Sequence, residues 1–132
     1  MPDNRDYNKE FADSDSVAGG RKYAYTFDFD VLHPYMVRSF EPFFNYGSML
    51  ELGSFKGAFT QRLMAYFDDI TCVEASSVAV EEAKARLGTK IHFVNALFET
   101  VTLPKRYDHI VLTHVLEHLD DPVRVLKRIN DE

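Results

Sequence analysis

A loop between two glycines, followed by a distant acidic residue, is the part of this sequence best suited to chemistry. Residues 49–57 read Met-Leu-Glu-Leu-Gly-Ser-Phe-Lys-Gly, so an apolar strand runs directly into a loop flanked by Gly53 and Gly57. Gly53 can adopt a backbone angle that other residues avoid, and Gly57 lets the next helix approach the strand or a ligand closely. Glu74 follows about 20 residues after Gly53, where an acidic side chain can accept both hydroxyls of a ribose. The spacing predicts a site for a ribose-containing ligand, although the two glycines alone also fit an ordinary strand-to-helix turn.

Two histidines and a glutamate form a second candidate group. His114, Glu117 and His118 are spaced so that a helical turn would place them on one face. In a structural interpretation, Glu117 and His118 brace the loop that precedes Asp121. In a functional interpretation, His114 or His118 is a general base, or the three side chains hold a divalent metal, for which imidazole favours zinc, iron or manganese. We predict His114 and His118 as catalytic residues and no bound metal.

Apolar runs and helical patterns alternate around these groups. Strands are expected in the run that starts at Met49 and over 69–74, 91–95 and 109–113, the last one covered on both faces. Helices are expected after Pro34, from Ala58 to about Phe67, between a Ser76 or Ser77 cap and Gly88, and after the Asp121–Pro122 pair. The alternating aromatic residues Tyr23, Tyr25, Phe27 and Phe29 predict a short extended piece. Strands that alternate with helices over short connections predict an α/β fold.

Short right-handed connections fix how such strands are ordered. The expected arrangement is an open parallel sheet of order 3-2-1-4. The chain reverses its winding between the first and fourth strands, and this places a ligand crevice beside the glycine loop. Residues 23–132 are assigned to this domain, and the polar residues 1–22 are expected to form a mobile arm or lid.

Composition and charge argue against several classes of partner. The formal net charge is −6 and no run of Lys or Arg exceeds two residues, so a nucleic-acid surface is not expected. Apolar runs are far shorter than the roughly 20 residues that cross a bilayer, and we therefore expect no membrane partner and a cytoplasmic protein. The single cysteine, Cys72, predicts no internal disulfide, and its apolar neighbours indicate a buried strand position.

Four segments, in this order, resemble the class I S-adenosylmethionine-dependent methyltransferases. They are LELGSFKG at 50–57, VEAS at 73–76, FVNALFE at 93–99 and YDHIVLTHVLEHLDDP at 107–122. The likeness extends from about Ser48 to Glu132 and implies a Rossmann-like fold. Strands 5–7 of the family fold are missing from this sequence. We therefore expect these residues to be the N-terminal portion of a longer enzyme.

The resemblance implies S-adenosylmethionine as cofactor and assigns its contacts. Glu51 would hold the loop and the cofactor's amino group, Glu74 the ribose hydroxyls, and the loop after the third strand the adenine. The full set of implied cofactor-binding residues is Glu51, Gly53, Ser54, Phe55, Lys56, Gly57, Glu74, Ala75, Asn95, Ala96, Leu97, Phe98, Thr113 and His114. Two positions depart from the family pattern. Phe55 replaces the middle glycine of the usual loop, so its ring either borders or fills cofactor space, and Leu97 stands where an aspartate often contacts the adenine.

The implied function is methyl transfer from S-adenosylmethionine to a small-molecule acceptor. A non-catalytic methyltransferase-like binding module is an alternative, favoured by Phe55, Leu97 and the short chain. A nicotinamide-dinucleotide-binding domain is a further alternative, but residues 53–58 lack the G-x-G-x-x-G spacing. The fourth strand would form an exposed edge, and such an edge predicts self-association.

Overall fold

A four-stranded parallel sheet organises the described part of the chain. The computed structural model describes residues 5–15 and 28–132. The strands are β1 (Ser48–Leu52), β2 (Asp69–Glu74), β3 (Ile91–Asn95) and β4 (His109–Leu112). They lie in the order β3-β2-β1-β4, and every neighbouring pair is parallel. The predicted α/β sheet and its order are therefore confirmed.

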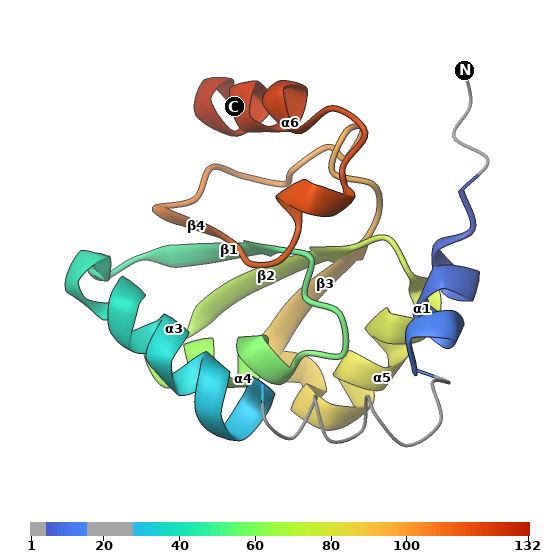
Figure 1. Ribbon diagram of the computed structural model, residues 1–132. Helices are drawn as coiled ribbons and strands as arrows, with labels where there is room; N and C mark the ends of the chain where they lie inside the picture. The colour runs from blue at the N-terminus through green and yellow to red at the C-terminus, as the bar shows by residue number, and fades with distance from the viewer. Residues whose placement is uncertain (1–4, 16–27) are drawn as a thin grey trace.

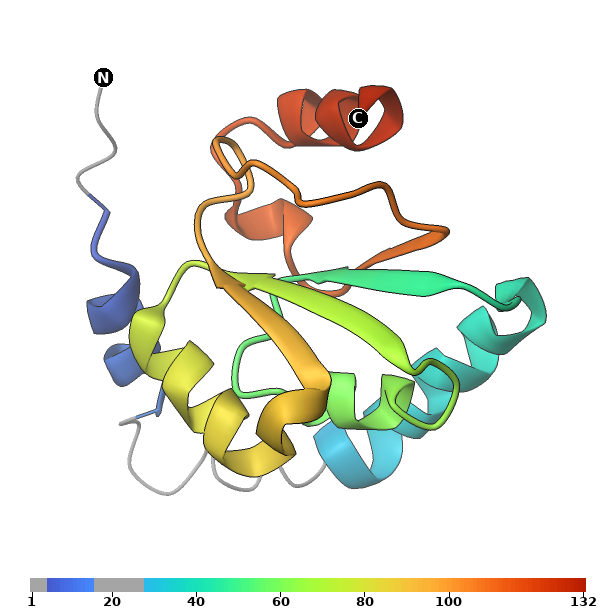
Figure 2. The same ribbon diagram turned by 180° about the vertical axis from the view of Figure 1, so that it is seen from behind.

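Helices cover both faces of this sheet (Figures 1 and 2). On one face lie α3, α4 and α5, while α6 lies on the other and α1 lies beside α5. Their bounds are α1 (Tyr7–Asp15), α3 (His33–Phe40), α4 (Ala58–Leu63), α5 (Ser77–Leu87) and α6 (Pro122–Asp131). Short turns complete the path, namely a π-helical turn η1 (Asp28–Leu32) and 3₁₀ turns η2 (Glu41–Phe43), η3 (Gly88–Lys90) and η4 (Leu116–His118).

Local sequence signals set ends of α5 and α6. The Ser76 hydroxyl accepts the Ala79 N–H at 3.2 Å and caps α5, and Gly88 ends that helix with a φ of 74°. The Asp121 carboxylate accepts the Arg124 N–H at 3.0 Å and caps α6. Capping side chains satisfy N–H groups that the first helical turn leaves unpaired. The predicted caps are therefore confirmed.

Three expectations about the elements were wrong or incomplete. Helix α4 stops at Leu63 instead of near Phe67, because the Ala65 and Tyr66 N–H groups bond three residues back and tighten the last turn. Strand β4 is only partly covered, with Val111 buried, because it lies at the edge of the described sheet. Phe29 belongs to η1, so it is not extended.

Other expectations fall wholly or partly outside the described residues. Tyr23, Tyr25 and Phe27 lie outside them, as does half of the arm at 1–22. Residues 7–15 of that arm form α1. The arm's mobility stays a prediction.

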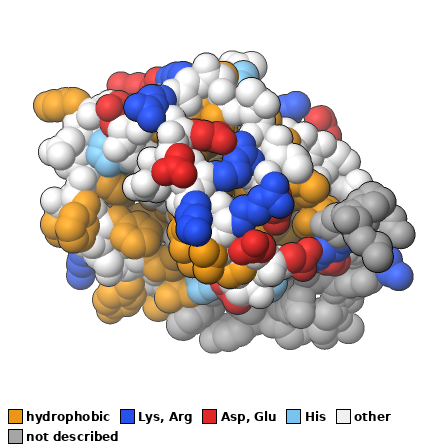
Figure 3. Space-filling model, turned by 90° about the horizontal axis from the view of Figure 1, so that it is seen from above, with side chains coloured by type: hydrophobic (Ala, Val, Ile, Leu, Met, Phe, Trp, Pro, Cys, Tyr) orange, Lys and Arg blue, Asp and Glu red, His pale blue; other side chains and the backbone are white. Residues whose placement is uncertain are grey.

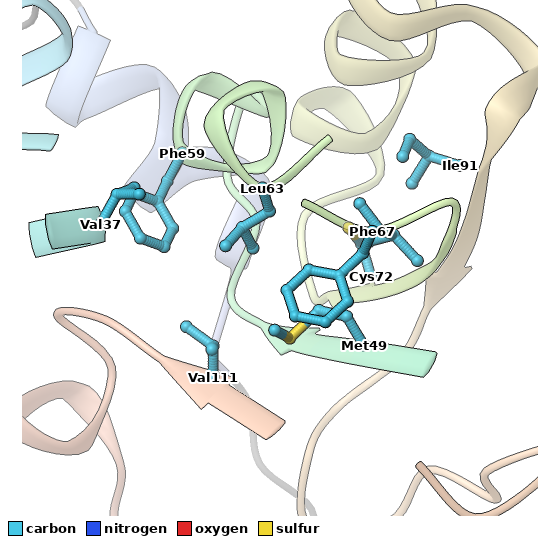
Figure 4. Packing of buried hydrophobic residues seen from close by; sticks show 9 residues of the cluster. Val37, Met49, Phe59, Leu63, Phe67, Cys72, Ile91 and Val111 are labelled. Atoms are coloured by element: carbon cyan, nitrogen blue, oxygen red, sulfur yellow. The ribbon is translucent and has the colours of Figure 1, made fainter. Parts of the chain in front are cut away.

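Two apolar clusters hold the layers together. Met49 packs on the α3–α4 face with Leu63, Cys72 and other buried side chains (Figure 4). Leu50 and Leu52 pack on the opposite face with Val73 and Val101. Neighbouring strand residues point to opposite faces, so β1, which is buried along its whole length, contributes to both clusters.

The outer surface is mixed in character. Viewed from the α6 side, Lys and Arg side chains lie among Asp and Glu, and hydrophobic side chains gather toward one side (Figure 3). Within 5–15 and 28–132, none of the helices has the length and apolar character required to span a bilayer.

Candidate functional site

A cavity of about 910 Å³ opens at the carboxyl ends of the parallel strands. The structure brings most of the predicted site residues to its wall. Those that line it are Glu51, Gly53, Ser54, Phe55, Lys56, Glu74, Ala75, Leu97, Phe98, Thr113, His114 and His118. Carboxyl ends of parallel strands are where open α/β sheets bind ligands. The cavity volume lies within the usual range for small-molecule sites.

Glu74 ends β2 and holds two turns of the backbone in place. One carboxylate oxygen accepts the Phe55 N–H at 3.0 Å, and the other accepts the Ser76 N–H at 2.9 Å. The side chain is half-buried and lines the cavity. Each carboxylate oxygen has a second acceptor position. Glu74 can therefore accept hydroxyl hydrogens from a ligand while it fixes the glycine loop.

Gly53 directly follows β1 and lines the cavity. Its φ is 84°, and its N–H donates to the Val73 carbonyl at 2.8 Å. A Cβ at this position would lie 2.5 Å from Val115 Cγ2 and 3.6 Å from Phe98 Cζ. The backbone angle and the close approach of Val115 favour glycine here, whereas the Phe98 distance is an ordinary contact.

Phe55 borders the cavity, and a large open volume remains beside it. Its side chain is half-buried and forms part of the wall. The Lys56 ammonium lies 5.9 Å from the centre of its ring. The φ of Phe55 is 50° and that of His114, which also lines the cavity, is 55°, so both are left-handed. Non-glycine residues in this conformation cost free energy and cluster at functional sites.

Glu51 is an acidic side chain buried at the cavity floor. It is 1% exposed, and its Oε2 accepts hydrogen bonds from the Thr60 hydroxyl and, at 3.5 Å, from the Cys72 thiol. Its Oε1 has no hydrogen-bond partner among the described residues. Burial raises the pKa of this carboxyl to about 7. A ligand donor would satisfy the unpaired oxygen and favour the charged form.

Gly57 serves packing between helices and lies outside the cavity lining. It precedes α4 with a φ of 82°, and a Cβ there would lie 2.8 Å from Leu87 Cδ1 and 3.2 Å from Ala83 Cβ on α5. The sequence predicted a close approach to the strand or to a ligand, whereas the close approach at Gly57 is made to α5.

A substitution at Gly57 in two backgrounds tests this role. Gly57→Ala should lower the free energy of unfolding by about 2–3 kcal/mol, because it combines a left-handed angle with overpacking. Made in a Leu87→Ala background, which keeps the φ of 82° and removes Leu87 Cδ1, the same substitution should cost only about 1 kcal/mol. Urea denaturation measures both losses, and equal losses in the two backgrounds would contradict the packing role.

Asn95 and Ala96 also lie outside the cavity lining. The Asn95 side-chain amide donates to the carbonyls of Glu74 and Ala75, at 2.8 and 3.0 Å. These two hydrogen bonds fix the backbone at the end of β2. Their direct contact with a cofactor stays a prediction, whereas Leu97 and Phe98 in the same loop do line the cavity.

His114, Glu117 and His118 come together as their spacing predicted. A Glu117 carboxylate oxygen lies 3.8 Å from His114 Nδ1 and 3.9 Å from His118 Nε2. The two imidazoles are 66% and 69% exposed at their side chains, and both line the cavity. Within 5–15 and 28–132, no group of three or more His, Cys, Asp or Glu side chains is arranged to hold a metal ion. Glu117 therefore lies beside both imidazoles at more than hydrogen-bond distance.

The family comparison matches most of this architecture. A family model described as a methyltransferase domain matches residues 50–131, a span that runs from β1 into α6. The match covers more than half of the 132 residues. The chain belongs to the methyltransferase domain family. None of the curated proteins matches it.

Solved structures share the fold of this methyltransferase domain. One is the N-methyltransferase NodS from Bradyrhizobium japonicum WM9 in complex with S-adenosyl-l-homocysteine, with a TM-score of 0.72 and 20% identity over 96% of this chain and 65% of that one. Another is an S-adenosylmethionine-dependent methyltransferase from Clostridium acetobutylicum ATCC 824, with a TM-score of 0.66 and 17% identity over 83% and 51%. A third, from Thermotoga maritima, is described as a possible histamine N-methyltransferase, with a TM-score of 0.67 and 21% identity over 83% and 50%. The chain thus spans about half to two thirds of the length of these structures.

Sequence reasoning missed both ends of the cavity in this methyltransferase domain. At the α5 end, Arg5 and Tyr7 line the wall, and Asn8 joins α1 to α5 by accepting the Ser76 hydroxyl at 2.8 Å. Arg5 also donates to the His118 carbonyl at 2.7 Å and so bridges to the β4 side. No motif or spacing links these residues to the glycine loop, so only the folded chain brings them together.

At the α3 end, the missed residues are Phe29, Asp30 and His33, all of which line the cavity. The signal nearest to them was Pro34, which marked the start of a helix. A helix start says nothing about which side chains face a ligand.

Proposed function

We propose that this methyltransferase domain binds S-adenosylmethionine in the cavity and transfers its methyl group to a small-molecule acceptor. The observation that carries the proposal is the Glu74 carboxylate, which lines the cavity while two backbone N–H groups hold it. A carboxylate in this place suits the two ribose hydroxyls of the cofactor. The NodS structure, which shares the fold, contains S-adenosyl-l-homocysteine.

Other residues fit the remaining parts of the cofactor. The unpaired Oε1 of Glu51 suits a donor such as an amino group, and the buried Ser54 lies beside it in the loop. Leu97 and Phe98 offer an apolar wall to the adenine. Leu97 cannot accept a hydrogen bond from the adenine amino group, so stacking and apolar contact must hold that ring.

When bound, S-adenosylmethionine supplies a methyl group on a positively charged sulfur. The protein's own work is to align the acceptor with that methyl group and to exclude water. Orientation of this kind supplies roughly 7–11 kcal/mol in favourable cases. Phe55 and His114, both left-handed, line the cavity and are our candidates for residues that serve alignment.

His114 and His118 are our proposed catalytic residues, acting as proton acceptors. Because both imidazoles are well exposed, we expect a contribution at the lower end of the 10²- to 10⁴-fold range of general bases. His114→Ala and His118→Ala should each lower turnover about 100-fold, and His118→Ala, which lies outside the implied cofactor-binding set, should leave the affinity for S-adenosylhomocysteine unchanged. Steady-state kinetics and calorimetry measure the two quantities. Unchanged turnover with intact folding would remove the substituted histidine from catalysis.

Calorimetric titration with S-adenosylmethionine and S-adenosylhomocysteine tests the cofactor assignment. Heat from both ligands supports it, whereas no heat from either overturns it. Binding without turnover on any acceptor would identify the alternative, a non-catalytic binding module. The family match gives no support to a nicotinamide-dinucleotide-binding domain. Self-association through the edge of β4 stays a proposal of its own.

A further inference from the structure

The cavity has two chemically different ends. The Glu74 end lies beside α5, and its neighbours are Tyr7 and Ser76. The other end lies where η1 and α3 pack near α4, whereas α1 lies beside α5 (Figure 1). If the adenosine occupies the Glu74 end, the α3 end remains for the methyl acceptor.

Aromatic rings form the wall of the α3 end. The His33 ring lies 5.2 Å from the Phe59 ring and 6.4 Å from the Phe29 ring, nearly perpendicular to both. The Arg62 guanidinium stacks over Phe29 at 4.2 Å and donates to its carbonyl at 2.7 Å, which fixes the ring. Perpendicular rings make an angular wall that surrounds a small group on more than one side. Such walls attract cations through the ring quadrupoles.

Two charged side chains of opposite sign lie at this end, Asp30 and Arg62. The Asp30 carboxylate lies on η1 at the cavity wall and is exposed, whereas the Arg62 guanidinium, which stacks on Phe29, lies outside the cavity lining. The basic side chains of the described lining belong to other parts of the cavity. Arg5 pairs with Glu10 near α1, Lys56 pairs with Glu82 of α5, and Arg86 lies on α5 itself. Asp30 is therefore the charged group that this end presents to a ligand, and it favours a cationic group over an anionic one.

We propose that the α3 end of the cavity is the acceptor pocket and that it takes an amine carried on an aromatic or apolar group. This inference rests on the proposed function, because it assumes that the cofactor fills the Glu74 end. Asp30 draws in the protonated amine, and the wall of Phe29, His33 and Phe59 holds its apolar part.

The transfer balances in charge and atoms. The ammonium first gives one proton to His114, which leaves a lone pair on nitrogen. That lone pair forms the new C–N bond as the S–C bond breaks, and the electron pair of the broken bond passes to sulfur. The methylated nitrogen keeps a single positive charge, and His114 passes its proton to water at the open rim. One proton is released for each methyl group transferred.

A matched pair of probes tests the amine preference by calorimetry. The probes are 2-phenylethylamine and 2-phenylethanol, titrated into the free chain and into the chain saturated with S-adenosylhomocysteine. The amine should bind at least fivefold more tightly than the alcohol. Asp30→Asn should remove about three- to fivefold of the amine's affinity and leave the alcohol unchanged, as for a partly exposed charge pair. Phe29→Leu should weaken both probes.

Controls separate this inference from the cofactor proposal. Asp68→Asn removes an exposed carboxylate outside the cavity lining and should change neither affinity. Equal binding of the two probes, no binding of the amine, or an Asp30→Asn variant with wild-type amine affinity would each overturn the acceptor pocket. Absence of heat with S-adenosylhomocysteine alone would overturn the cofactor proposal instead, whatever the amine does.

Discussion

Replacing Glu74 with alanine is expected to weaken binding of S-adenosylhomocysteine about 100-fold. Hydrogen bonds to a charged group contribute about 1.5–3 kcal/mol each, and the two ribose hydroxyls would lose this partner. The substitution also frees the Phe55 and Ser76 N–H groups, which the carboxylate holds at 3.0 and 2.9 Å. The variant therefore lacks both the hydrogen bond that holds the glycine loop and the hydrogen bonds expected to hold the ligand. Calorimetry of the purified variant measures the change in Kd.

Two further variants sharpen the interpretation of this loss. Glu74→Gln keeps one carbonyl oxygen and should weaken binding about 10-fold, between the wild type and the alanine variant. Glu81→Ala removes an exposed glutamate of α5 outside the cavity lining and should leave the Kd unchanged. A Glu74→Ala variant that binds as tightly as Glu81→Ala would falsify the ribose assignment.

The stability of the free protein is expected to fall as pH rises, because of Glu51. Burial raises the pKa of this carboxyl from 4.5 to about 7, so the folded state binds the proton more tightly than the unfolded state does. The contribution to stability is complete below pH 4.5 and is lost progressively until the pH passes about 7. The shift corresponds to about 3 kcal/mol of unfolding free energy.

Glu51→Gln isolates this effect, since glutamine has a similar shape and does not titrate. The difference in unfolding free energy between variant and wild type should move by about 3 kcal/mol in favour of the variant between pH 4 and pH 8. Urea denaturation across this pH range measures it. Glu81→Gln, which replaces an exposed glutamate, should show no such drift. A constant difference between Glu51→Gln and wild type would mean that Glu51 titrates normally in the folded protein.

Much of the fold could be predicted because local signals and apolar patterns agreed. The bounds of β2 and β3 match the prediction residue for residue, since each apolar run ends at a polar side chain, Glu74 or Asn95. The caps at Ser76 and Asp121 were readable from their own side chains. The length of α4 was not readable, because Phe67 keeps helical spacing and is buried while the backbone has already turned.

Some residues of the candidate site could likewise be predicted from the sequence, and others could not. Glu74 and Gly53 could be predicted because both occur at fixed distances from a strand end. Asn95 was placed at the right strand end, but its amide donates to the carbonyls of Glu74 and Ala75 instead of lining the cavity. Asp30 and His33 could not be found, because their place at the cavity depends on how α3 packs against α4. Packing between helices distant in sequence leaves no pattern in either segment alone.

Because Cys72 is buried, its reactivity can report how often the protein opens near the site. Cys72 is fully buried on β2, in contact with Thr60 and Glu51 beneath the cavity floor. It is the sole cysteine of the 132 residues, and burial raises its pKa, so the folded thiol is doubly protected from reagents. Any labelling of the native protein must therefore pass through an opening of this region. The rate of alkylation thus records, at one defined atom and without an introduced probe, how often the floor of the site opens.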